Sequence, residues 1–122
     1  MNLLIVTGNL ANEIELKKTA SGVSVVSGAV AVQRAFKGPK GEKEVDYVSF
    51  VAWDKKADYL SRFAKKGDRL EMSGRLESRR YYDKDSRPCI VWELIVENVV
   101  SFSKKKTEES MAEPLTGDEL PY

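Results

Sequence analysis

Basic residues stand beside aromatic residues at several places in this sequence. The neighbours are Arg34 and Lys37 with Phe36, Lys55 with Trp53, and Arg79 and Arg80 with Tyr81, with Arg87 in the turn that follows. Lysine and arginine bind phosphates, and aromatic rings stack on nucleobases. Many surface cations only solvate the protein, but the repeated aromatic and basic adjacency favours a groove for nucleic acid, with these six cations contacting phosphates.

No other set of side chains in the sequence indicates chemistry. Histidine is absent and Cys89 is the only cysteine, so the usual zinc sites, an internal disulfide and a histidine general base are excluded. Asp54 and Asp58 resemble a carboxylate pair, but a helix cap and an exposed charge explain them better. Gly8 and Gly74 belong to no phosphate-binding motif. We therefore predict no catalytic residue, no metal and no cofactor.

Length and charge indicate one folded domain and a tail of different character. The chain has 122 residues, 42% of them apolar, and no apolar run near the roughly twenty residues that cross a bilayer. Residues 1–106 hold all 20 Lys and Arg against 14 Asp and Glu, whereas residues 107–122 hold five acids and no base. With no leader-like start, we expect a cytoplasmic protein whose basic body, residues 1–103, binds a polyanion.

Alternation of apolar and polar residues predicts five strands and one helix. The helix spans Lys55–Lys66, capped by Asp54 and ended by Gly67. Residues 36–44, rich in glycine and charge, form a loop that could close over a ligand. The order of elements is that of an all-β, five-stranded oligonucleotide/oligosaccharide-binding (OB) Greek-key barrel, with the helix between the third and fourth strands. The expected strands are Leu3–Leu10 continued by Glu13–Lys17, then Val23–Gln33, Tyr47–Trp53, Arg69–Arg80 and Cys89–Phe102.

The third predicted strand carries an aromatic residue on each face. Tyr47 and Trp53 share one face with Ser49 and Val51, and Phe50 shares the other with Val48 and Ala52. The second face is the more uniformly apolar, so we expect it to line the core and leave Tyr47 and Trp53 exposed. Phe50 and Trp92 are predicted to be core residues.

Residues 104–122 lack periodicity and are predicted to be a disordered acidic tail. Its tip combines acids, apolar side chains and a rigid proline, which suits a partner with an apolar pocket ringed by Arg or Lys. The residues of this predicted docking tip are Asp118, Glu119, Leu120, Pro121 and Tyr122.

Segments across nearly the whole chain resemble the bacterial-type single-stranded DNA-binding proteins. The matching segments are Leu4–Leu10, Asp46–Trp53, Met72–Leu76 and the Leu-Pro-aromatic tip. The resemblance implies a homotetramer that binds single-stranded DNA without sequence preference in replication, recombination and repair, and a tip that recruits replication and repair proteins. It also implies that four aromatic residues stack on bases, namely Phe36, Tyr47, Trp53 and Tyr81.

Other functions fit parts of the sequence. A related barrel could bind RNA or serve as a primosomal accessory protein, and a protein–protein adaptor could use the barrel for assembly and the tip for docking. A nuclease fits poorly, because histidine and a carboxylate cluster are both absent.

Overall fold

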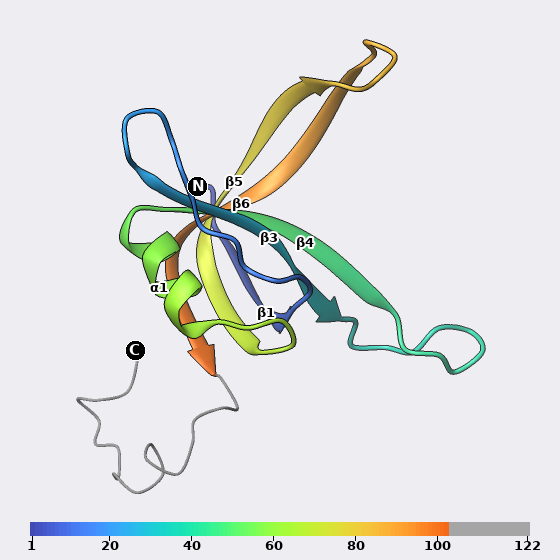
Figure 1. Ribbon diagram of the computed structural model, residues 1–122. Helices are drawn as coiled ribbons and strands as arrows, with labels where there is room; N and C mark the ends of the chain where they lie inside the picture. Colours follow the sequence, from blue (N-terminus) through green and yellow to red (C-terminus); the bar gives the residue numbers. More distant parts are fainter. Residues whose placement is uncertain (103–122) are drawn as a thin grey trace, which may run out of the picture.

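The computed structural model describes residues 1–102, and the predicted tail and its docking tip lie outside the described residues. Figure 1 shows a strongly curved sheet with one helix at its end. The elements are β1 (Leu4–Leu10), β2 (Lys17–Lys18), β3 (Ser24–Gln33), β4 (Val45–Trp53), α1 (Lys55–Phe63), β5 (Arg69–Tyr82) and β6 (Pro88–Phe102).

The five long strands close into a barrel. The strands lie in the order β1, β5, β6, β4, β3, and β1 also pairs with β3 at Asn9 and Leu10, which joins the two ends. All the pairings are antiparallel except β4 with β6, which pair in parallel at Phe50 and Val51. The predicted OB barrel, with its helix after the third long strand, is confirmed.

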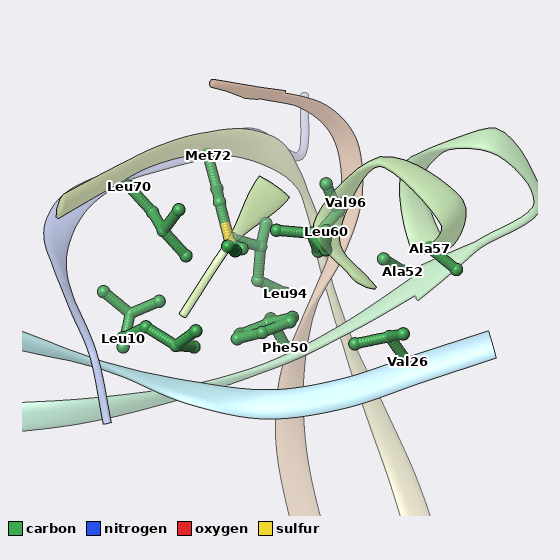
Figure 2. Close-up of a cluster of buried hydrophobic side chains, with 12 residues drawn as sticks. Leu10, Val26, Phe50, Ala52, Ala57, Leu60, Leu70, Met72, Leu94 and Val96 are labelled. Carbon is green, nitrogen blue, oxygen red and sulfur yellow. The ribbon is translucent and has the colours of Figure 1, made fainter. Parts of the chain in front are cut away.

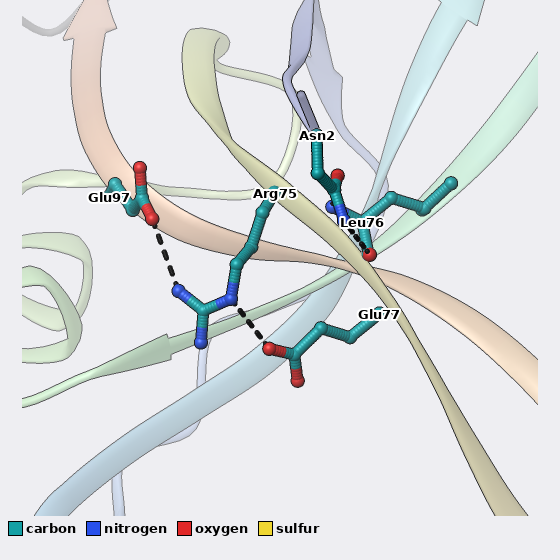
Figure 3. Close-up of polar contacts among 5 residues, drawn as sticks. All are labelled: Asn2, Arg75, Leu76, Glu77 and Glu97. Carbon is teal, nitrogen blue, oxygen red and sulfur yellow. Dashed lines mark hydrogen bonds and ion pairs between the residues drawn. The ribbon is translucent and has the colours of Figure 1, made fainter.

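A bulge bends β5 where the barrel wall ends and a free hairpin begins. The register between β5 and β6 shifts at Ser73 and Gly74, and a side chain at Gly74 would overlap the carbonyl oxygen of Ile95. Two side chains, those of Asn2 and Arg75, make further contacts at this bend (Figure 3). The Asn2 side chain bonds to both backbone groups of Leu76, at 2.9 and 2.8 Å, and Arg75 bonds to Glu77 and Glu97 at 2.6 and 3.1 Å. The bend is therefore fixed on both sides of β5.

Phe50 lies at the centre of the core. Its side chain is 1% exposed, and Figure 2 shows it between Leu10, Leu94 and Val26. The helix closes one end of the barrel with Ala57 and Leu60, which are fully buried. The buried residues around Phe50 are Leu10, Val26, Val30, Ala52, Ala57, Leu60, Ala64, Leu70, Met72, Leu94 and Val96.

The predicted continuation of the first strand through Glu13–Lys17 is wrong. The strand β1 ends at Leu10, and only Lys17 and Lys18 pair again, as the two-residue β2. The side chain of Asn12 accepts a hydrogen bond from the Ala29 backbone N–H at 2.8 Å. This side-chain bond takes the place of a strand pairing, so the chain leaves the sheet despite its alternating pattern.

The helix is shorter than predicted, and it lacks the predicted cap. It ends at Phe63, because Ala64 is extended and the Asp68 carboxylate accepts a hydrogen bond from the Lys65 N–H at 2.9 Å. Asp54 precedes the helix, but its side chain makes no capping hydrogen bond and its φ is 55°. Its backbone N–H instead donates to Ser24, so the link to β3 decides its conformation.

Trp92 is not a core residue, and its predicted burial is wrong. Beyond Leu76 the strands β5 and β6 leave the barrel as a two-stranded ribbon (Figure 1). On the ribbon face that carries Trp92, no further layer packs against the two strands, so Trp92, directly across from Ser78, is 59% exposed. Within residues 1–102, no helix is long and apolar enough to cross a membrane.

We predict that Phe50→Ala lowers the free energy of unfolding by roughly 3–5 kcal/mol, because it opens a cavity in the barrel centre. Urea titration followed by circular dichroism measures this loss. Phe36→Ala is the matched control, since Phe36 is 85% exposed and its loss changes stability by less than about 0.5 kcal/mol. Equal losses for the two variants would contradict the assigned core.

Candidate nucleic-acid interface

The outer face of β4 presents two aromatic rings to solvent. Tyr47 is 69% exposed and Trp53 is 42% exposed, whereas Phe50 and Ala52 between them are buried. The predicted division of the two faces of this strand is confirmed. Because both ends of β4 carry an outward ring, a ligand along this strand meets an aromatic surface at each end.

The neighbouring strand leaves the Tyr47 ring uncovered. Tyr47 is directly across from Ala31 in β3, and the next outward pairs are Ser49 with Ala29 and Val51 with Ser27. Alanine and serine side chains are too short to shield a ring beside them. The surface between the rings is consequently low and flat, as stacking on a base requires.

Trp53 borders a depression with a volume of about 350 Å³. It lies where β3 and β4 meet the start of the ribbon, and its lining combines apolar residues with an ion pair. A nucleobase is flat and largely apolar on its faces, so this space suits a base placed against the Trp53 ring. The lining residues are Val25, Ser27, Val51, Trp53, Glu77, Ser78, Arg79, Glu93 and Ile95.

Tyr81 extends the aromatic surface onto the ribbon. It follows Arg79 on the same face of β5, its ring is 45% exposed, and the Arg79 guanidinium carbon lies 6.0 Å from the ring centroid. Cys89 is directly across from Tyr81, and its thiol raises the pKa of the Tyr81 hydroxyl.

Phe36 stands in the loop between β3 and β4. Its ring is 85% exposed, and the loop is closed at its base by the Arg34 N–H donating to the Glu44 carbonyl at 2.8 Å. A second bond, from the Gly38 N–H to the Glu42 carbonyl, narrows its tip. The loop thus holds the solvent-exposed Phe36 ring just before the start of β4, the end of that strand at which Tyr47 lies.

Arg34 is already bound to two carboxylates at the base of this loop. Its Nε and Nη2 donate to Asp46 at 2.9 and 2.8 Å, and its Nη1 donates to Glu44 at 3.1 Å. The hydrogen bond to Asp46 raises the pKa of Arg34, and Arg34 in turn lowers the pKa of Asp46. Sequence reasoning placed Arg34 by its neighbour Phe36 and could not foresee this pairing across the loop.

Arg79 is held in the same way by Glu93, which sequence reasoning missed. Its Nε and Nη2 donate to the two carboxylate oxygens at 3.2 and 3.0 Å, and this bond raises the pKa of Arg79. The side chain of Glu93 is only 10% exposed. An acid within the apolar run from Ile90 to Val96 is the sequence signal, but only the register of β5 and β6 shows what it contacts. Arg87 also pairs with a carboxylate, that of Asp85, at 3.1 Å.

Within residues 1–102, the other three residues predicted to contact phosphates form no ion pair with a carboxylate. Among residues 1–102, no carboxylate oxygen lies within 4.0 Å of the side-chain nitrogens of Lys37, Lys55 or Arg80. Lys37 adjoins Phe36, and Lys55 begins α1 just after Trp53. Arg80, however, lies directly across from Ile90, on the ribbon face opposite Arg79 and Tyr81. In the same part of the chain, no group of three or more His, Cys, Asp and Glu could hold a metal.

The fold and this surface define a class, an OB barrel with an open aromatic face bordered by cations. Residues 1–102 match the model of the Single-strand binding protein family, and the chain belongs to that family. The resemblance seen in the sequence is thereby confirmed. The family's description names a binding protein.

Curated relatives carry matching names. The chain is 35% identical over 99 residues to "Single-stranded DNA-binding protein 2" of Listeria monocytogenes. The matched residues cover 81% of this chain and 62% of that protein. It is 36% identical to "Single-stranded DNA-binding protein" of Bacillus cereus, over 81% of this chain and 58% of that one. The chain thus spans about three-fifths of the length of these two relatives.

A solved structure shares the fold. The structure described as "Plasmodium falciparum SSB complex with ssDNA" superposes with a TM-score of 0.74, covering 84% of this chain and 96% of that one. The sequence identity is 20%, so this likeness concerns the fold alone.

We predict that Arg79→Ala lowers the urea midpoint of unfolding, because it leaves the Glu93 carboxylate poorly hydrated and without its hydrogen-bond donor. Arg80→Ala is the matched control, since Arg80 has no carboxylate partner within residues 1–102. The two variants remove the same charge from neighbouring positions. Equal midpoints would show that the Arg79 and Glu93 pair adds nothing to stability.

Proposed function

We propose that this protein binds and protects single-stranded DNA without sequence preference during replication, recombination and repair, and catalyses no reaction. The observation that carries the proposal is the outer face of β4, where Tyr47 and Trp53 are open to solvent while Phe50 between them is buried. Bases stack on these two rings and on Phe36 and Tyr81. The phosphates contact the cations beside the rings.

Three further findings support this function. The chain belongs to the Single-strand binding protein family, and the relatives above are named single-stranded DNA-binding proteins. The structure of similar fold is described as a complex with single-stranded DNA. The Tyr47 ring borders small residues of β3, Ala31 and Ala29, which suits contact with any base.

Stacking supplies enough free energy for tight binding. Each stacked base contributes roughly 1–3 kcal/mol, so four rings contribute on the order of 4–12 kcal/mol before the strand's ordering cost. Every base has an aromatic face, so this contribution is nearly independent of sequence. Phosphate contacts add affinity that falls as salt rises.

We predict that Trp53→Ala weakens binding of labelled oligo-dT by roughly 1–3 kcal/mol, since it removes one stacking platform. Fluorescence anisotropy measures the affinity, with oligo-dA as a second ligand that loses a similar amount. Phe63→Ala is the control, because Phe63 is also an exposed ring but lies on α1. Unchanged affinity in Trp53→Ala would remove the stacking face, and stronger binding of poly-U than of poly-dT would favour an RNA-binding role.

We also propose that the protein assembles as a homotetramer. A tetramer built from paired dimers needs two different interfaces, and the barrel offers two surfaces. Within residues 1–102, Leu4–Gly8 of β1 pair with a strand on one side only, which leaves an open sheet edge. The ribbon adds an exposed apolar patch, which we call the ribbon patch, made of Leu76, Tyr82, Ile90 and Trp92.

We predict that Ile90→Glu lowers the mass measured by sedimentation equilibrium, because a charge in the ribbon patch opposes its burial against a second copy. Phe63→Glu places the same charge at an exposed apolar residue of the helix and leaves the mass unchanged. A wild-type protein that sediments as a monomer at micromolar concentration would end the tetramer proposal while leaving DNA binding untouched.

For the segment beyond the described residues, we propose that Asp118–Tyr122 recruits replication and repair proteins. The support is its sequence, in which two acids precede Leu120, Pro121 and an aromatic residue. We further propose that the protein acts in the cytoplasm. Its single cysteine, Cys89, forms no internal disulfide, which suits a reducing compartment.

A further inference from the structure

Two arginines of the interface are bound by carboxylates with the same geometry. In each, Nε and Nη2 donate to both oxygens of one carboxylate, at 2.9 and 2.8 Å from Arg34 to Asp46 and at 3.2 and 3.0 Å from Arg79 to Glu93. This parallel, two-bond arrangement is also the one with which arginine binds a phosphate. The carboxylates therefore hold the donors that a phosphate would use.

The two pairs lie at different places relative to the rings. Glu93 and Arg79 line the depression that Trp53 borders. Asp46 precedes Tyr47 in β4 and is on the opposite face of that strand, so the Arg34 and Asp46 pair lies at the base of the loop that holds Phe36. Other cations near the rings, Lys37 and Lys55, have no carboxylate within 4.0 Å among residues 1–102. Among the described residues, the cations near the rings are therefore of two kinds. The lysines have no carboxylate partner, whereas the arginines are neutralised by carboxylates of the protein itself.

We infer that Asp46 and Glu93 are internal counterions that limit the affinity and the salt dependence of DNA binding. A free cation that neutralises a phosphate releases counterions condensed on the DNA, and this release makes binding both tighter and dependent on salt. An arginine already neutralised by a carboxylate of the protein neutralises no phosphate in this way, so it releases fewer of these counterions. Arg34 and Arg79 then shape the interface, while the free lysines supply the salt-dependent affinity. This inference rests on the proposed function.

The two carboxylates differ in how firmly they are held. The side chains of Arg34 and Asp46 are both half exposed, at 54% and 52%, so water and salt compete with their bond. The side chain of Glu93 is only 10% exposed, so breaking its bond to Arg79 would leave the Glu93 carboxylate charged and poorly hydrated. Arg34 also keeps a second partner, Glu44, when Asp46 is removed. Neutralising Glu93 is accordingly the change with the larger effect on binding.

The test is a set of anisotropy titrations of labelled oligo-dT between 50 mM and 1 M NaCl, with the full chain and its variants. Glu93→Gln keeps the size of the side chain and frees the charge of Arg79. We expect its salt slope to steepen by about 0.7, with about eightfold tighter binding at 50 mM and equal binding near 1 M. Asp46→Asn changes both quantities in the same direction by less.

Asp58→Asn is the matched control. It removes the same charge from an exposed residue of α1 that has no ion-pair partner among the described residues, so it reports the effect of net charge alone. Its salt slope is expected to equal that of the wild type. Circular dichroism establishes that each variant is folded, and Asp46→Asn, at an exposed position, carries the test if Glu93→Gln does not fold.

Three outcomes overturn the inference. Slopes for Glu93→Gln and Asp46→Asn that equal the slope for Asp58→Asn would show that the carboxylates hold back no charge. Weaker binding by folded Glu93→Gln at an unchanged slope would make Glu93 a residue that positions Arg79. In both of these cases the wild type still binds oligo-dT, so the proposed function stands. The third outcome is a wild type that binds no oligo-dT at 50 mM NaCl, which overturns the proposed function together with the inference.

Discussion

The burial of Phe50 inside a closed barrel decides which side chains of β4 face outward. Once β1 pairs with both β5 and β3, each long strand has one inner and one outer face, and side chains alternate between them. Phe50 fills the centre, so Tyr47 and Trp53, an odd number of residues away on the same strand, must face outward. The aromatic face is thus a consequence of core packing, and a one-residue slip of β4 would bury it.

The ribbon obeys a different constraint. Where β5 and β6 leave the barrel, most of their side chains, with Glu93 an exception, have no layer to pack against, so both faces carry exposed side chains. One face presents Arg79 and Tyr81 beside the Trp53 depression, and the other presents the ribbon patch. A single hairpin thereby carries both the surface proposed to contact nucleic acid and the surface proposed to contact a second copy of the chain.

Charge on this protein is arranged in pairs rather than as a uniform basic field. Arg34, Arg79 and Arg87 each contact a carboxylate, and within residues 1–102 only part of the predicted phosphate set has no carboxylate partner. Counting basic residues therefore overstates the positive charge that these residues offer. Under the proposed function, stacking would supply much of the affinity, and stacking is far less sensitive to salt than phosphate contact.

The sequence alone determined the order of the long strands along the chain, the position of the helix and the inward face of β4, because alternation and turn chemistry are local properties. Tertiary structure decided what depends on distant partners. Asn12 bonds to Ala29 and ends the first strand early, and Trp92 is exposed because its strand has left the barrel. Glu93 meets Arg79 only through the register of β5 and β6, fourteen residues apart in sequence, which no local pattern specifies.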